Sequence, residues 1–224
     1  MGIPLKNLFG DKSSLVWRMM LEDPARQWTT LDFAEQGLSL GLVSEVMNRG
    51  EAAGYLERVR KGRQSYSKLI RKDQLLKDWM TFYAFDRNLH TYYYYPAADF
   101  LKVLSQYLKS KETDYALTLY SASRLIAPYV KDGRHFVYLD LDREKFLPFV
   151  KEMALQTGLL ELRRGGNVCF AMPFYRSSIF GRSRKIKGHP VVSNLQLYLD
   201  LMGFPPTGRE EAEHLIKKKG EPFV

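Results

Sequence analysis

Apolar residues in the first part of the chain recur at helical spacing in three segments. Val43, Val46 and Met47 show the pattern most clearly, because positions i, i+3 and i+4 share one face of a helix. Residues that can cap a helix stand at the start of these segments, namely Asp11, Thr29 or Thr30, and Ser39. The pattern therefore predicts three short helices, the last of which ends at Gly54.

After these helices the pattern changes to that of strands. Tyr55–Arg60 and Ser65–Ile70 predict a two-stranded ribbon, with a turn at Lys61–Gln64. Three helices followed by a ribbon are typical of a winged helix-turn-helix, and Gly37 permits the positive φ that the turn between helices needs. We therefore expect residues 1–86 to form a winged helix-turn-helix DNA-binding domain.

From residue 87 onward the predicted strands and helices alternate. Strands are predicted at Tyr115–Tyr120, His135–Leu141, Leu159–Leu162 and Val168–Met172. Helices are predicted at Ala98–Lys109, Ser121–Ala127, Arg143–Gln156, Val191–Met202 and Arg209–Lys219. The tyrosines at 92–95 favour a half-buried strand or loop anchor over base stacking, and Gly165–Asn167 predicts a hairpin turn between the last two strands. We expect residues 87–224 to form a second domain around a mixed sheet, which makes the chain α+β.

The composition is that of a folded protein, since 45% of the 224 residues are hydrophobic and 26% are charged. The single cysteine, Cys169, excludes an intramolecular disulfide and a cysteine-based zinc site. No apolar run approaches the roughly 20 residues of a membrane span. The N-terminus has no signal-peptide pattern, so we expect a cytoplasmic protein that does not contact a membrane.

Positive charge is concentrated in two stretches. Lys and Arg number 34 against 25 Asp and Glu, and the net charge of +9 favours polyanionic partners. The surplus lies mainly in residues 57–72, which include the predicted ribbon, and in residues 176–189, which are predicted to form a mobile loop or a ribbon.

The first basic stretch and the third helix supply a candidate DNA interface. Cations on the ribbon neutralise phosphates, and Asn or Arg on the helix can contact adenine or guanine edges in the major groove. The alternatives are a protein-interaction module and, for Arg49, ordinary helix surface. The predicted DNA-binding residues are Thr30, Ser39, Ser44, Glu45, Asn48, Arg49, Arg60, Lys61, Arg63 and Gln64.

The second basic stretch supplies a candidate surface for a partner protein or RNA. Its cations are Arg176, Arg182, Arg184, Lys185 and Lys187, and no acid lies among them in the sequence. Such a cluster suits an acidic surface or an RNA backbone. The alternative is a solvated loop that keeps the protein soluble.

Asp140 and Asp142 form the strongest candidate for catalysis. They follow an apolar strand at the spacing by which nucleotidyltransferases hold two Mg²⁺ ions. Such enzymes also need a Gly-Ser turn to cradle the triphosphate, whereas the matching Tyr120–Ser123 has no glycine. Asp142 is instead predicted to cap the helix from Arg143. The four histidines lie far apart, so we predict no catalytic residue, no metal and no cofactor.

Three stretches carry a resemblance to a known family, namely Tyr115–Tyr129 (YALTLYSASRLIAPY), Pro190–Leu201 (PVVSNLQLYLDL) and Gly208–Leu215 (GREEAEHL). They resemble the AbiE-type abortive-infection antitoxins of type IV toxin–antitoxin systems. The resemblance implies an N-terminal DNA-binding domain that represses its own operon. It also implies a C-terminal domain that counters a nucleotidyltransferase-like toxin and itself resembles a catalytically inactive nucleotidyltransferase.

The sequence thus predicts a non-enzymatic transcriptional repressor that acts as an antitoxin. Its expected partners are duplex DNA, as an inverted repeat in its own promoter, and a nucleotidyltransferase-like toxin or the RNA target of that toxin. Two alternatives stay open. One is an active nucleotidyltransferase with an appended winged helix, and the other is a plain ligand-responsive repressor.

Overall fold

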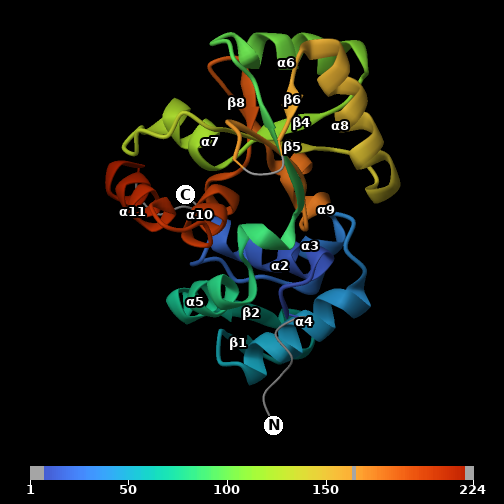
Figure 1. Ribbon diagram of the computed structural model, residues 1–224. Coiled ribbons are helices and arrows are strands. Elements are labelled where there is room, and N and C mark those ends of the chain that lie inside the picture. Colours follow the sequence, from blue (N-terminus) through green and yellow to red (C-terminus); the bar gives the residue numbers. More distant parts are fainter. Residues whose placement is uncertain (1–7, 163–164, 220–224) are drawn as a thin grey trace. The chain divides into compact units, whose positions relative to one another are not determined.

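The computed structural model describes residues 8–162 and 165–219, except for the side chains of Arg63 and Lys219. The chain divides into two compact units, with the division between Tyr83 and Ala84 (Figure 1). The part before the division is called unit 1 and the part after it unit 2. Each is described by itself.

Unit 1 contains the predicted helices and ribbon. Its helices are α2 (Asp11–Glu22), α3 (Thr30–Ala34), α4 (Leu40–Ala52) and α5 (Lys72–Phe82). Strands β1 (Leu56–Val59) and β2 (Tyr66–Leu69) form the antiparallel ribbon, joined by a 3₁₀ turn at Gly62–Gln64. A position that the sequence analysis missed extends the ribbon, because Trp28 exchanges two backbone hydrogen bonds with Ser67, of 2.8 and 2.7 Å.

Local chemistry explains where α3 and α4 begin. Thr29 caps α3 in a capping box with Asp32, and the Ser39 hydroxyl accepts a hydrogen bond from the Leu42 N–H at 3.3 Å. Between these helices Gly37 has a φ of +79°, as predicted. The packing of α4 depends on Gly50, since a Cβ there would lie 2.3 Å from Cη2 of the buried Trp17.

Unit 2 is built on a seven-stranded mixed sheet in the order β6-β3-β7-β5-β4-β9-β8. The strands are β3 (Leu89–Tyr94), β4 (Tyr115–Leu117), β5 (His135–Leu139), β6 (Leu160–Glu161), β7 (Val168–Met172), β8 (Arg184–Ile186) and β9 (His189–Val191). The pairs β5–β7 and β4–β9 are parallel and the other pairs are antiparallel. The predicted mixed sheet is therefore confirmed.

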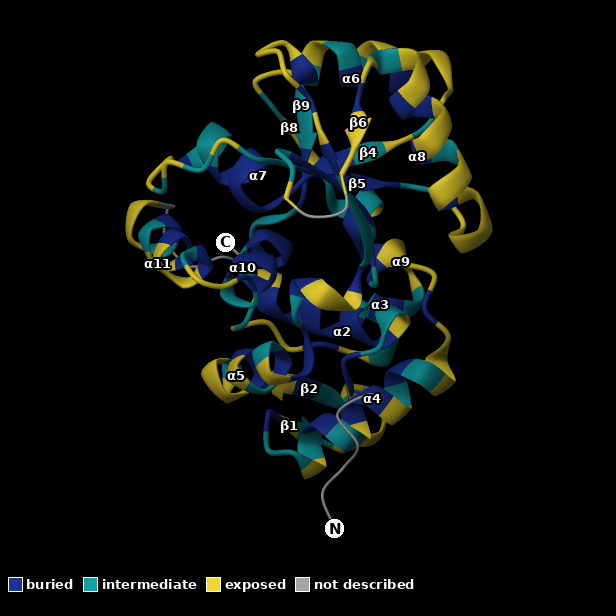
Figure 2. Ribbon diagram, in the orientation of Figure 1, coloured by how far each residue is buried: buried dark blue, intermediate teal, exposed yellow. Residues whose placement is uncertain are grey.

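The helices of unit 2 are α6 (Phe100–Ser110), α7 (Leu119–Ile126), α8 (Arg143–Thr157), α9 (Arg176–Ile179), α10 (Asn194–Met202) and α11 (Gly208–Lys219). Helices α6 and α8 lie on one side of the sheet, and α7, α10 and α11 lie on the other (Figure 1). Successive side chains of β5 point to opposite faces of the sheet, as in any strand. His135 packs on Phe100 on one face, and Phe136 packs on Tyr120 and Phe204 on the other. Strand β5 is buried from Phe136 to Leu139, whereas the outer faces of α6 and α8 are exposed (Figure 2).

The predicted hairpin at Gly165–Asn167 is wrong, because β3 lies between β6 and β7 and pairs with both. Instead, Gly166 and Asn167 lie close to the backbone of β3 and of Tyr95, the residue that follows it. A Cβ on Gly166 would lie 2.5 Å from the Tyr93 carbonyl oxygen. The Asn167 amide accepts from the Tyr95 N–H at 2.8 Å and donates to the Tyr95 carbonyl at 2.7 Å. The first three residues of the tyrosine run lie on β3, with Tyr93 buried and Tyr94 exposed, so the strand alternative is confirmed for them, and Tyr95 follows the strand.

The second basic stretch is a structured segment. It forms α9, a 3₁₀ turn at Phe180–Arg182 and the β8–β9 ribbon, so the ribbon alternative is confirmed. Lys187 and Gly188, with φ of +49° and +86°, make the tight turn between these strands. Because β9 extends to Val191, α10 begins at Asn194, later than predicted. Within the described residues, no helix combines the length and the apolar character that a membrane span requires.

Candidate nucleic-acid interface

Helix α4 presents an exposed face in unit 1. Ser39, Leu40, Glu45 and Asn48 are exposed, and Leu40 keeps 52% of its surface accessible. The opposite face buries Val43, Val46 and Met47. The hydrophobic period thus sets which side of α4 is available to a partner (Figure 2).

Two arginines join the β1–β2 ribbon to α4. Arg58 donates a short hydrogen bond to the Asn48 side-chain oxygen. Arg60 forms a bidentate pair with Glu51, with contacts of 2.9 and 2.5 Å, and the hydrogen bond from Arg60 holds the pKa of the Glu51 carboxyl below its usual value. The sequence did not indicate that Arg58 and Glu51 connect the ribbon to α4, because the tertiary structure determines which side chains they pair with.

The other predicted DNA-binding residues have different surroundings. Arg49 forms a 2.7 Å ion pair with Glu45 one turn earlier in α4, and Ser44 is half-buried. Thr30 and Arg60 line one hollow of about 400 Å³ between the start of α3 and the ribbon. Lys61 and Gln64 are exposed at the tip of the ribbon, whereas the side chain of Arg63 lies outside the described residues.

In unit 2, Asp140 and Asp142 are bound by an arginine. Arg176 Nε lies 2.8 Å from Asp140 Oδ1, and Arg176 Nη1 lies 2.5 Å from Asp142 Oδ1. These hydrogen bonds lower the pKa of Asp142. Asp142 is the N-cap residue of α8, at the predicted position, but its side chain makes no capping hydrogen bond. The cause is Arg176, which lies 34 residues away in the sequence and engages that carboxylate instead.

The acid pair and the serine segment that were compared with a nucleotidyltransferase signature lie at opposite ends of β5. The Ser121 hydroxyl accepts a hydrogen bond from the Phe136 N–H at 2.7 Å, near the start of the strand, whereas Asp140 and Asp142 follow its end. Among the described residues, no group of three or more His, Cys, Asp or Glu side chains is placed to hold a metal ion.

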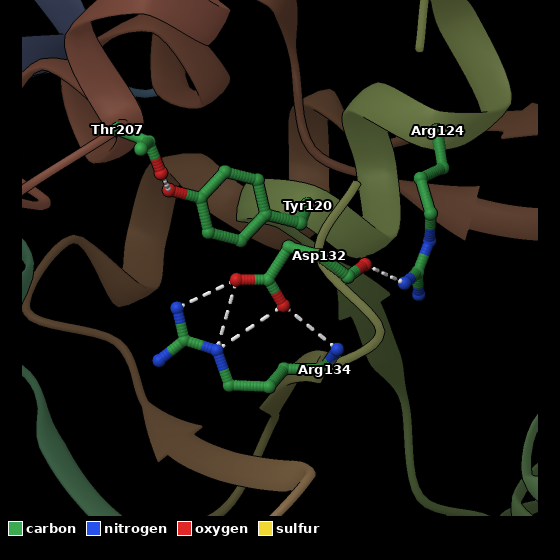
Figure 3. A network of polar contacts seen from close by, with 5 residues as sticks. All are labelled: Tyr120, Arg124, Asp132, Arg134 and Thr207. Atoms are coloured by element: carbon green, nitrogen blue, oxygen red, sulfur yellow. Dashed lines mark hydrogen bonds and ion pairs between the residues drawn. The ribbon is translucent and has the colours of Figure 1, made fainter. Parts of the chain in front are cut away.

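A second polar network in unit 2 includes Tyr120, Arg124, Asp132 and Arg134, with Arg124 donating to the Asp132 carbonyl (Figure 3). Arg134 forms a bidentate pair with Asp132 and lies over the rings of Tyr120, Phe136 and Phe204, at 5.3 to 5.8 Å from their centroids. Burial alone raises the pKa of Asp132, but the hydrogen bonds from Arg134 outweigh it and lower that pKa. The network holds the segment before β5 against α7, and no residue in it was predicted as functional.

The five cations of the second basic stretch do not share one environment. Arg176 is bound by the two aspartates, Arg182 is half-buried, and Arg184 donates to the Asn194 side chain. Burial lowers the pKa of Arg182 and of Arg184. Lys185 and Lys187 are exposed on β8 and on the turn that follows it. The description of this stretch as a cluster without nearby acids is therefore wrong for Arg176.

His135 predicts a pH dependence of stability. Its ring lies 4.7 Å from the Phe100 ring, and burial together with the nearby Arg124 lowers its pKa from 6.5 to about 4. Between these values the unfolded chain binds a proton that the folded chain does not, so acidification favours unfolding. We expect the free energy of unfolding to fall by about 2–3 kcal/mol less in His135→Gln than in the wild type between pH 7.5 and pH 4.5. Urea denaturation at both pH values measures this, and equal losses contradict it.

Comparison with known proteins identifies the class of this chain. A model of a family of transcriptional regulators matches residues 68–220, which is more than half of the chain and includes every helix and strand of unit 2. That family is the AbiEi antitoxin of type IV toxin–antitoxin systems, and the chain belongs to it. No curated protein and no solved structure matches the chain. Helices α2, α3 and α4 precede the matched residues, so their role is argued from their own chemistry.

Proposed function

We propose that unit 1 is a winged helix-turn-helix that binds duplex DNA, with α4 as the recognition helix and the β1–β2 ribbon as the wing. The observation that carries this proposal is the pairing of Arg58 with Asn48 and of Arg60 with Glu51, which fixes a basic ribbon beside the exposed face of α4. A helix fits the major groove, while cations on an adjoining ribbon neutralise backbone phosphates.

The contact between Arg58 and Asn48 limits what Asn48 can read. Because Arg58 occupies one of the two lone pairs of the Asn48 side-chain oxygen, the groups that Asn48 offers most freely to a base are its amide N–H groups. These suit the N7 and O6 acceptors of guanine, N7 of adenine or O4 of thymine, whereas a bidentate contact to adenine needs the oxygen as well. Arg49 is paired with Glu45 through Nη2, so a bidentate base contact that uses this nitrogen competes with the ion pair.

The DNA target is proposed to be an inverted repeat in the protein's own promoter, at which the protein represses transcription. The membership of this chain in a family of antitoxins that are transcriptional regulators supports this target. A gel shift of the promoter fragment with the full-length protein tests it. If the protein shifts an unrelated fragment of equal length as strongly, the proposed autoregulation is wrong.

Unit 2 is proposed to have a catalytically inactive nucleotidyltransferase-like fold and to counter a nucleotidyltransferase-like toxin. Arg176 supports the absence of catalysis, because it already neutralises the two carboxylates that would hold Mg²⁺. The separation of Ser121 from those carboxylates along β5 supports it as well, since a triphosphate must contact both its cradle and the metal ions.

We expect no nucleotidyl transfer by the purified protein. The measurement is incorporation of labelled nucleoside triphosphates into tRNA or protein acceptors in the presence of Mg²⁺. Incorporation that is lost in Asp140→Asn would contradict the proposal and favour the alternative of an active enzyme with an appended winged helix.

A further inference from the structure

A groove of about 570 Å³ in unit 2 has the features of a nucleic-acid site. It lies between α6, the start of β4 and the ribbon that contains β8, the edge strand of the sheet. Its charged lining residues are Lys109, Arg184, Lys185 and Asp114, so cations outnumber acids. Lys109 comes from α6 and was not among the predicted site residues, because the fold rather than the sequence brings it to the β8–β9 ribbon.

The hydroxyl groups of the lining indicate what the ligand must supply. Ser105 donates its proton to the Lys102 carbonyl at 2.9 Å, Thr113 to the Lys111 carbonyl at 3.1 Å and Ser183 to the Phe180 carbonyl at 3.0 Å. Each hydroxyl oxygen therefore keeps only lone pairs for a ligand. A ligand that satisfies these oxygens brings hydrogen-bond donors next to its anionic groups, as the ribose 2′-hydroxyl lies next to each phosphate in RNA.

Two aromatic side chains also line the groove. These are Tyr115 and Phe180, and both are half-buried. Aromatic rings beside cations are the arrangement by which proteins bind single-stranded nucleic acid, because every base has a face that stacks. Bases within a duplex are already stacked on their neighbours, which favours a single strand here.

We propose that this groove binds single-stranded RNA. Lys109, Arg184 and Lys185 contact phosphates, the hydroxyls of Ser105, Thr113 and Ser183 accept from 2′-hydroxyl groups, and bases stack on Phe180 or Tyr115. Asp114 accepts from the exocyclic amino group of cytosine or guanine. The inference goes beyond the proposed function. Its test uses neither toxin nor promoter DNA, so RNA binding and the proposed function can each fail without the other.

The experiment measures fluorescence anisotropy of labelled oligo(U) RNA and of oligo(dT) of equal length with the full-length protein. We expect tighter binding of the RNA. The double variant Lys109→Ala/Lys185→Ala is expected to weaken RNA binding about tenfold and to lower the salt slope by about 1.4, since each lost phosphate contact removes about 0.7 on a single strand.

The matched control is Lys131→Ala/Lys151→Ala, which removes the same charge from exposed positions outside the groove lining. It is expected to bind RNA as the wild type does. All four substituted lysines of the two double variants are exposed, so equal unfolding midpoints are expected and are checked by thermal denaturation.

A second variant, Ser105→Ala/Ser183→Ala, tests the choice of RNA. We expect it to bind oligo(U) and oligo(dT) with nearly equal affinity. Three results overturn the proposal: equal affinity of the wild type for RNA and DNA, equal RNA affinity of the Lys109/Lys185 variant and its control, or displacement of RNA by oligoglutamate as effectively as by unlabelled oligo(U). The last result assigns the groove to an acidic peptide.

Discussion

Lys61→Ala is expected to weaken binding of the protein to every duplex, specific or not, and to lower the slope of log affinity against log salt by about 0.9. The physical reason is the loss of one phosphate contact at the exposed tip of the β1–β2 ribbon. Asn48→Ala is expected to behave differently, with a loss of about 1–3 kcal/mol at the promoter site and little change on unrelated DNA. Gel-shift titrations over a range of salt concentrations measure both effects.

The control for Lys61→Ala is Lys77→Ala, which removes an exposed positive charge from α5. The control for Asn48→Ala is its unfolding midpoint, because the substitution also removes the partner of Arg58. The winged-helix assignment is wrong if Lys61→Ala and Lys77→Ala give the same affinity and salt slope as the wild type. It is also wrong if Asn48→Ala weakens specific and unrelated DNA equally.

Protection of cells from the toxin is expected to come from unit 2 and not to require DNA binding. Full-length protein that carries Asn48→Ala and Lys61→Ala should protect cells expressing the neighbouring toxin gene as well as the wild type does. A chain that ends at Tyr83 should give no protection, because the match to the antitoxin family lies mainly in unit 2. Colony counts after toxin induction measure this, with both proteins expressed from a separate inducible promoter.

The separate promoter serves as the control, since it removes the effect of autoregulation on the amount of antitoxin. Loss of protection in the DNA-binding variant, at equal protein levels, would contradict the proposed division between the units. Equal growth of the wild type and the vector control would instead favour the plain ligand-responsive repressor.

Local chemistry explains why some features of unit 1 were predictable. The face of α4 follows from three apolar residues within one and a half turns, and the starts of α3 and α4 follow from hydroxyl side chains that bond to N–H groups three residues ahead. Family membership was likewise predicted from stretches of unit 2 that lie within the matched residues. Each of these features depends on residues that are close together in the chain.

Pairing across long sequence separations was decided only by the tertiary structure. The segment at Gly165–Asn167 has the composition of a hairpin turn, yet β3 enters between β6 and β7 from far earlier in the chain. Asp142 stands where a helix cap belongs, yet Arg176 engages its carboxylate. Sequence periodicity carries no information on such partners, because contacts between elements depend on how the sheet is ordered.

The sequence by itself therefore determined most of the helices, the β1–β2 ribbon, the mixed sheet and the antitoxin family. Only the tertiary structure decided which charges remain available to a ligand. From the sequence, Asn48, Arg60 and Arg176 are side chains that could contact nucleic acid. In the fold, each of the three is hydrogen-bonded to another side chain of the protein. Lys109 became a site candidate only through the placement of α6 beside the β8–β9 ribbon. The physical reason is that composition sets how much charge a chain carries, while packing decides which of it is neutralised.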